Sequence, residues 1–166
     1  MCIDFDQSKS KDGFSKGYQA PPILNFKAEA DEIKKAIKKS GLQIVYQSKV
    51  ATKINFEQTI RKNPKVIHIS CHGIRLEIAK QQQMAISTED VHIEGHYLLF
   101  ENFQGAGELV SATQLKQLLG SSQHDIDLIV VAACDSETIG RIFQRCSVRH
   151  VVCVEQKRFV LDEAAI

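Results

Sequence analysis

An unbroken run of apolar residues in the last third of the chain predicts a buried β-strand. Residues 128–133 (LIVVAA) do not alternate between apolar and polar positions, which suits a strand covered on both faces of a parallel sheet. Cys134, Asp135 and Ser136 follow, and a helix pattern begins after them. The sequence therefore places a thiol at the carboxyl end of a buried strand and near a helix N-terminus, where open α/β sheets hold their chemistry.

The rest of the chain alternates between strand and helix patterns. The β-α-β-α-β order of its first half implies right-handed crossovers and a parallel sheet, so we expect an α/β fold. The predicted strands cover residues 23–26, 42–47, 65–70, 127–133 and 148–154, with a hairpin strand at 96–101. The predicted helices cover residues 28–39, 53–62 after a Thr52 cap, 111–119 and 137–145.

The two ends of the chain differ from this pattern. Residues 1–20 mix Lys, Ser, Asp and Gly without a period, which predicts a flexible N-terminal segment ahead of a domain over residues 21–166. Residues 160–166 (VLDEAAI) have the composition of a helix that begins but does not complete an apolar face. We therefore expect the domain to be incomplete at its C-terminus, within a longer protein. Residues 75–95 are polar and uneven, and no element is predicted there.

Composition and charge narrow the classes of function. Lys and Arg number 21 and Asp and Glu number 20, so no overall field points to nucleic acid or to an anionic membrane. No apolar run approaches the roughly 20 residues that span a bilayer. The five cysteines are an odd number without a CxxC pair or a secretory signal, which predicts free thiols in the cytoplasm.

A zinc site built on His68, Cys71 and His72 is a weak alternative. Successive strand residues point to opposite faces of the sheet, and no second ligand pair follows at finger spacing. We therefore expect neither a metal nor a cofactor.

Two predicted strands end in residues that suit nucleophilic catalysis. One runs into His72 and Gly73, and the other into Cys134. A cysteine nucleophile needs a partner that takes its proton or stabilises its thiolate, and a histidine at the same sheet edge does this. The backbone N–H groups of Gly73 and Cys134 are candidate donors to the oxyanion, and a glycine lets a substrate carbonyl come close.

Structural roles are open for several of these residues. Cys134 alone could be a small hydrophobic residue at a strand end, and His68, Cys71, Cys146 and Cys153 are interpreted as structural. Asp135 is interpreted as a helix cap, with the recognition of a basic P1 side chain as the alternative.

The segments HISCHG (68–73) and VVAACDSETIG (130–140) resemble the CHAT domain, a caspase-like module often found beside tetratricopeptide repeats. Its motifs have the form apolar-H-x-x-x-H-G and apolar-S/A-A-C-E/D-S/T. The likeness extends to a strand and acidic helix near residues 23–39, to SATQL at 111–115 and to RHVVCVE at 149–155. The resemblance implies a flavodoxin-like or caspase-like α/β/α sandwich of three layers, a His72/Cys134 dyad and cleavage of a peptide bond in a partner protein.

Two departures from related peptidases limit what the resemblance implies. Caspases carry Q-A-C-[RQG]-G, whereas residues 132–136 are AACDS, so specificity for aspartate does not follow. In the family the sheet continues past its fifth strand into a segment that helps to form the substrate pocket, and we expect that segment to be missing. Two hypotheses remain: a cysteine endopeptidase, and a catalytically silent interaction module of a larger signalling or scaffold protein.

Overall fold

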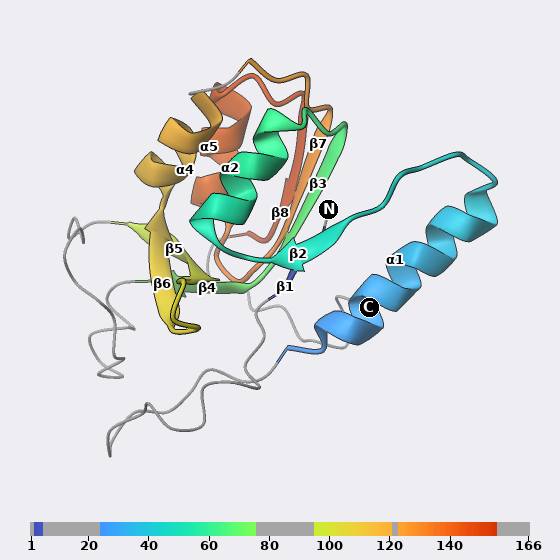
Figure 1. The fold of residues 1–166 in the computed structure, drawn as a ribbon. Coiled ribbons are helices and arrows are strands. Elements are labelled where there is room, and N and C mark those ends of the chain that lie inside the picture. The colour runs from blue at the N-terminus through green and yellow to red at the C-terminus, as the bar shows by residue number, and fades with distance from the viewer. Residues whose placement is uncertain (1, 5–23, 76–94, 121–122, 156–166) are drawn as a thin grey trace.

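The structure is a computed structural model that describes residues 2–4, 24–75, 95–120 and 123–155. A parallel sheet forms its centre, with the strand order β3-β7-β8 (Figure 1). The register pairs Ile67 with Ile129, and Ile129 with Val151. The strands are β3 (Val66–Ser70), β7 (Leu128–Ala132) and β8 (His150–Cys153).

A short parallel pair of strands lies beside this sheet. Strand β1 (Cys2–Asp4) pairs with β2 (Ser48–Val50), and β1 also contacts β3. The chain therefore returns to the edge of the central sheet before it enters β3.

A separate antiparallel sheet begins where β3 ends. It consists of β4 (His72–Arg75), β5 (His96–Glu101) and β6 (Gly107–Ser111), with β5 in the middle. Since β4 starts two residues after the last residue of β3, the chain turns from one sheet into the other at Cys71.

Three helices pack on one face of the parallel sheet, as Figure 1 shows: α2 (Lys53–Arg61), α4 (Ala112–Gly120) and α5 (Glu137–Arg145). The core lies between them and the sheet. The ring of Phe56 lies 6.1 Å from that of Phe100 and 6.4 Å from that of Phe143, and all three are fully buried. The sheet supplies Ile67, Ile69, Ile129 and Val131 to this core.

Helix α1 (Phe26–Ser40) lies apart from these helices and extends away from the sheet in Figure 1. The Asn25 side chain caps it by accepting a hydrogen bond from the Ala28 N–H (3.2 Å), and Gly41 ends it in a left-handed conformation. Within α1, only Glu29 and Ala30 are buried. Most of the helix surface is therefore exposed.

The mixed α/β class with a parallel sheet and helices is confirmed. Most elements lie where the sequence predicted them. Two predicted strands are exceptions. Helix α1 already begins at Phe26, within the strand predicted at residues 23–26. The strand predicted at residues 42–47 does not form, and the chain pairs at β2 instead. Residues 2–4, predicted as part of a flexible segment, form β1.

The prediction that residues 128–133 are covered on both faces is wrong for part of that strand. Ile129 and Val131 are buried, whereas Leu128, Val130 and Ala132 are only half-buried because the described helices pack densely on just one face. The predictions for residues 5–20 and 160–166 lie outside the described residues.

Candidate active site

The register of the central sheet brings the two predicted motifs to one edge. Ser70 is the last residue of β3 and pairs with Ala132, the last residue of β7, and the Cys71 N–H then donates to the Ala132 carbonyl (3.4 Å). Extending the same register by two residues would align His72 with Cys134. Both motifs therefore leave the sheet at its carboxyl edge, the usual position of sites in open α/β folds.

The backbone of Gly73 lies directly against the backbone of Cys134. A Cβ atom at Gly73 would be 2.7 Å from the Cys134 carbonyl carbon and still closer to its oxygen, and real Cβ atoms do not approach so near. Glycine is required here because the Cys134 peptide occupies the space of a side chain. The sequence predicted that a glycine here leaves room for a substrate carbonyl. In the structure, the Cys134 peptide occupies the space on the side-chain side of Gly73.

The predicted dyad residues stand on the two segments that meet at this contact. His72 is the first residue of β4 and is half-buried, and Cys134 follows β7 and is also half-buried. Helix α5 begins at Glu137, three residues after Cys134, so its N-terminus lies next in the chain to the thiol-bearing turn. A helix N-terminus favours negative charge nearby, including that of a thiolate.

Asp135, interpreted from the sequence as a helix cap, lies one residue before the N-cap position of α5. The N-cap is Ser136, which makes no side-chain capping bond. The Asp135 carboxylate is buried and accepts a hydrogen bond from Arg75 Nη2 at 2.9 Å. Arg75 belongs to the same strand as His72, so the ion pair joins the strand of the histidine to the turn of the cysteine.

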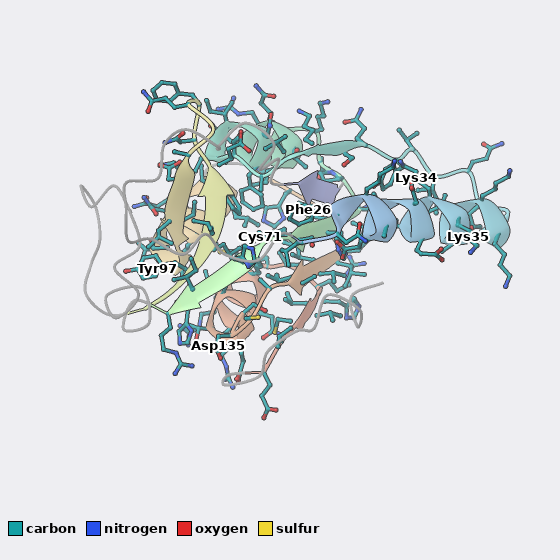
Figure 2. The ribbon with its side chains drawn as sticks, turned by 90° about the horizontal axis from the view of Figure 1, so that it is seen from below. Phe26, Lys34, Lys35, Cys71, Tyr97 and Asp135 are labelled. Carbon is teal, nitrogen blue, oxygen red and sulfur yellow. The ribbon has the colours of Figure 1, made fainter. Side chains whose placement is uncertain are left out.

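The backbone at Asp135 has φ = +52°, in the left-handed region that side chains adopt infrequently. Figure 2 shows Asp135 beside helix α5, with strand β4 close to it. Aspartate is one of the few residues that tolerates this conformation, and the turn directs its carboxylate to Arg75.

Ser136 is a structural residue of the site that the sequence reasoning did not identify. It is fully buried, donates to the Val131 carbonyl (3.2 Å) and accepts from the Val154 N–H (2.9 Å). It therefore connects the end of β7 to the residue that follows β8. A serine before a helix is ordinarily taken for a cap, so the local pattern gave no signal for this role.

The other thiols and His68 have the structural positions that were predicted. Cys71 is 2% exposed, and burial, with the neighbouring Cys134 and Glu29, raises the pKa of its thiol far above the ordinary value. Burial also raises the pKa of Cys146 and of Cys153, which pack against the core. His68 faces α1, where its Nε2 lies 2.7 Å from the Glu29 carboxylate.

The described part of the chain contains no cluster of three or more His, Cys, Asp or Glu side chains arranged to hold a metal ion. Among the helices that the structure describes, none has the length and apolar character needed to cross a membrane.

This combination defines a class of protein: an α/β domain with cysteine and histidine motifs at the carboxyl edge of its parallel sheet. The model of the CHAT domain family matches residues 6–153. Because the match covers most of the 166 residues, the chain belongs to the CHAT domain family, whose members are caspase-like. Comparison with curated proteins gives no match.

Proposed function

We propose that this CHAT domain is a cysteine endopeptidase domain that cleaves a protein or peptide partner through His72 and Cys134. The main support is the backbone contact between Gly73 and Cys134, because it holds the two motifs together at the sheet edge. The membership of a caspase-like family supports the same chemistry.

In the proposed reaction His72 takes the proton of the Cys134 thiol, and the sulfur attacks the scissile carbonyl to form a tetrahedral intermediate. The backbone N–H groups of Gly73 and Cys134 are the proposed donors to its oxyanion. The C–N bond then breaks, and His72 gives a proton to the leaving amine. A water molecule hydrolyses the resulting thioester, which releases the acid product and restores the thiol.

The proposed architecture is a three-layer α/β/α sandwich of the flavodoxin-like or caspase-like kind. The contact of β1 with β3 gives the spatial order β2-β1-β3-β7-β8, which corresponds to the 2-1-3-4-5 order of flavodoxin-like sheets. Helices α2, α4 and α5 form one outer layer (Figure 1), and α1 is the proposed start of the other. The partner domains of a longer protein, including tetratricopeptide repeats, remain part of this proposal.

The second candidate function is a silent interaction module of a larger protein. The observation that favours it is the exposed apolar surface of the segment after α1, where Leu42 is 66% exposed and Val45 is 91% exposed. Recognition of a basic P1 residue by Asp135 is a weaker part of the peptidase proposal, because Arg75 already binds that carboxylate.

The rate of alkylation by iodoacetamide at pH 6 separates the two functions. An ordinary thiol has a pKa of about 8.5 and is almost entirely protonated at this pH. We expect Cys134 in the full chain to react at least about tenfold faster than glutathione, because thiolate formation is what activates a cysteine. Peptide mass spectrometry measures the labelling of each cysteine separately.

His72→Ala removes the proposed partner and should abolish this excess reactivity. His150→Ala is the matched control, because His150 is exposed at the start of β8, at the opposite end of the sheet. If Cys134 reacts no faster than glutathione, and His72→Ala changes nothing, the peptidase proposal is lost and the interaction module is retained.

A further inference from the structure

A groove lies between α1, the extended segment after it and the start of β3. Its volume is about 720 Å³. Five branched aliphatic side chains line it, namely Ile33, Ile37, Ile44, Val45 and Val66. Ile33 and Ile37 are four residues apart on α1, so they present one continuous apolar stripe to the groove.

The histidine and lysine side chains that line the groove are already paired within the chain. His68 faces Glu29, the Lys62 ammonium donates to Gln47 (3.1 Å), and Lys65 pairs with Asp125. The lining contains no Asp or Glu. An occupant would therefore be held in the groove mainly by apolar contact.

The stretch of chain from which the groove is built carries a surplus of positive charge. Residues 26–68 contain ten Lys and Arg but four Asp and Glu, although the whole chain is almost neutral. Lys34 lies over the ring of Tyr46, 5.7 Å from its centre, and Figure 2 shows Lys34 and Lys35 on the part of α1 that extends beyond the sheet. Lys38 and Lys39, in the last turn of α1, have no carboxylate partner among the residues that the structure describes.

We propose that this groove is the docking site for an acidic amphipathic helix of a partner protein. The apolar lining fits a partner helix with apolar residues spaced at i, i+3, i+4 and i+7, and the lysines of α1 fit acidic residues at its edges. A helix about 10 Å wide that rises 1.5 Å per residue fills roughly 120 Å³ per residue, so the groove accommodates about six residues of it. The docking site is separate from Cys134 and needs no peptidase chemistry.

Fluorescence anisotropy with two synthetic peptides tests the site on the full chain. Both peptides have 14 residues and Leu at i, i+3, i+4 and i+7, but one has Glu and the other Lys at the remaining positions. We expect the Glu peptide to bind and the Lys peptide to bind at least about tenfold more weakly, because the lysines of α1 repel it.

Two variants test whether the Glu peptide binds in the groove. Val45→Asp puts a carboxylate into the apolar lining at a position that is 91% exposed, so the fold tolerates it, and should weaken binding of the Glu peptide at least about tenfold. Lys38→Glu combined with Lys39→Glu should weaken it about fivefold or more. Lys116→Glu, at an exposed position on α4, is the control and should change the affinity by less than twofold.

Several results would overturn the proposal. Equal binding of the two peptides would exclude an acidic partner, and unchanged binding to Val45→Asp would exclude the groove. If Val45→Asp instead alters the sedimentation coefficient of the chain alone, the occupant is a second copy. If phosphatidylserine vesicles sediment the wild type but not the variant, while neither peptide binds, the surface binds membrane.

Discussion

Substitution of Gly73 by alanine tests the backbone contact between Gly73 and Cys134, on which the candidate site depends. In Gly73→Ala the new Cβ would overlap the Cys134 peptide, which belongs to the backbone and cannot rotate away. We expect the free energy of unfolding to fall by about 2 kcal/mol, the middle of the range for overpacking, together with a loss of Cys134 reactivity. Urea denaturation and the alkylation rate measure the two effects.

Gly120→Ala is the matched control for this change. A Cβ at Gly120 would meet nothing within 4 Å, and the residue lies at the end of α4. Its unfolding free energy should stay within about 1 kcal/mol of the wild type, because only the entropy of the unfolded chain changes. Equal stability of the two alanine variants would show that Gly73 and Cys134 are not in contact.

The ion pair between Arg75 and Asp135 should couple the strand of His72 to the turn of Cys134. Its side chains are 23% and 9% exposed, so the pair is more shielded from water than the surface ion pairs of α1. A double-mutant cycle with Arg75→Gln and Asp135→Asn should give a coupling energy of about 1–3 kcal/mol in urea denaturation.

A cycle with Glu57→Gln and Arg61→Gln serves as the comparison, because that i,i+4 pair on α2 is exposed. Its coupling energy should be below about 0.5 kcal/mol. A coupling for Arg75 and Asp135 that is no larger than this value would contradict a buried pair.

At the scale of elements, the sequence predicted those whose signals are local. Thr52 caps α2 by accepting from the Asn55 N–H at 3.0 Å, and the apolar runs of β3 and β7 form the predicted parallel ladder. Residues 42–47 have the sequence pattern of a strand but pair with none of the described strands. A segment forms a β-strand only when a neighbouring strand pairs with it.

Long-range pairing explains what the sequence did not reveal. Strand β4 has four residues and pairs with β5, which begins 21 residues after β4 ends, so no local period marks it. The pairing of Asp135 with Arg75 likewise spans 60 positions, so the local sequence gave no sign of it. His72, Gly73 and Cys134 were identified because their motifs end predicted strands, whereas Ser136 was missed because its bonds are tertiary.

Helix α1 should exchange its amide hydrogens faster than the other helices. Its second half, from Ile33 to Ser40, contains no buried residue, whereas Phe56 and Ile60 anchor α2 in the core. Segments with few buried contacts open locally at low free energy. We expect exchange in residues 33–40 to be at least about tenfold faster than in residues 56–60, as measured by mass spectrometry.

A substitution of the buried Glu29 can be tested by the same measurement of amide hydrogen exchange. Glu29→Ala removes the carboxylate that faces His68, so exchange should increase along the whole of α1 and stay constant in α2. Asp31→Ala, at an exposed position of the same helix, should leave exchange within about twofold of the wild type. Protection of α1 equal to that of α2 would contradict the loose attachment.

At the scale of the whole molecule, the core formed by the described residues lies on one face of the parallel sheet. The described helices α2, α4 and α5 cover one face of the parallel sheet with large buried side chains, while Val66 and Val152 remain about half exposed. The stability of the described part of the chain therefore depends on the core that includes Cys71. A titratable group in that core makes the stability depend on pH.

Cys71 should lower the stability of the folded chain at alkaline pH. Burial raises the pKa of this thiol, so the native state keeps its proton where the unfolded chain, with a pKa of about 8.5, loses it. Above that value the unfolded state binds fewer protons, and the unfolding free energy falls by up to about 1.4 kcal/mol per pH unit. Between pH 7 and 10 the Cys71 thiol should therefore account for a loss of about 2 kcal/mol.

Comparison with Cys71→Ala isolates this contribution from other titrating groups, such as Lys65 and Tyr97, which both chains share. The variant starts from a lower stability because it leaves a cavity, but its decline from pH 7 to 10 should be smaller by about 2 kcal/mol. Urea denaturation at both pH values measures the difference. Parallel declines in the two proteins would show that Cys71 ionises in the folded state and is not enclosed in the core.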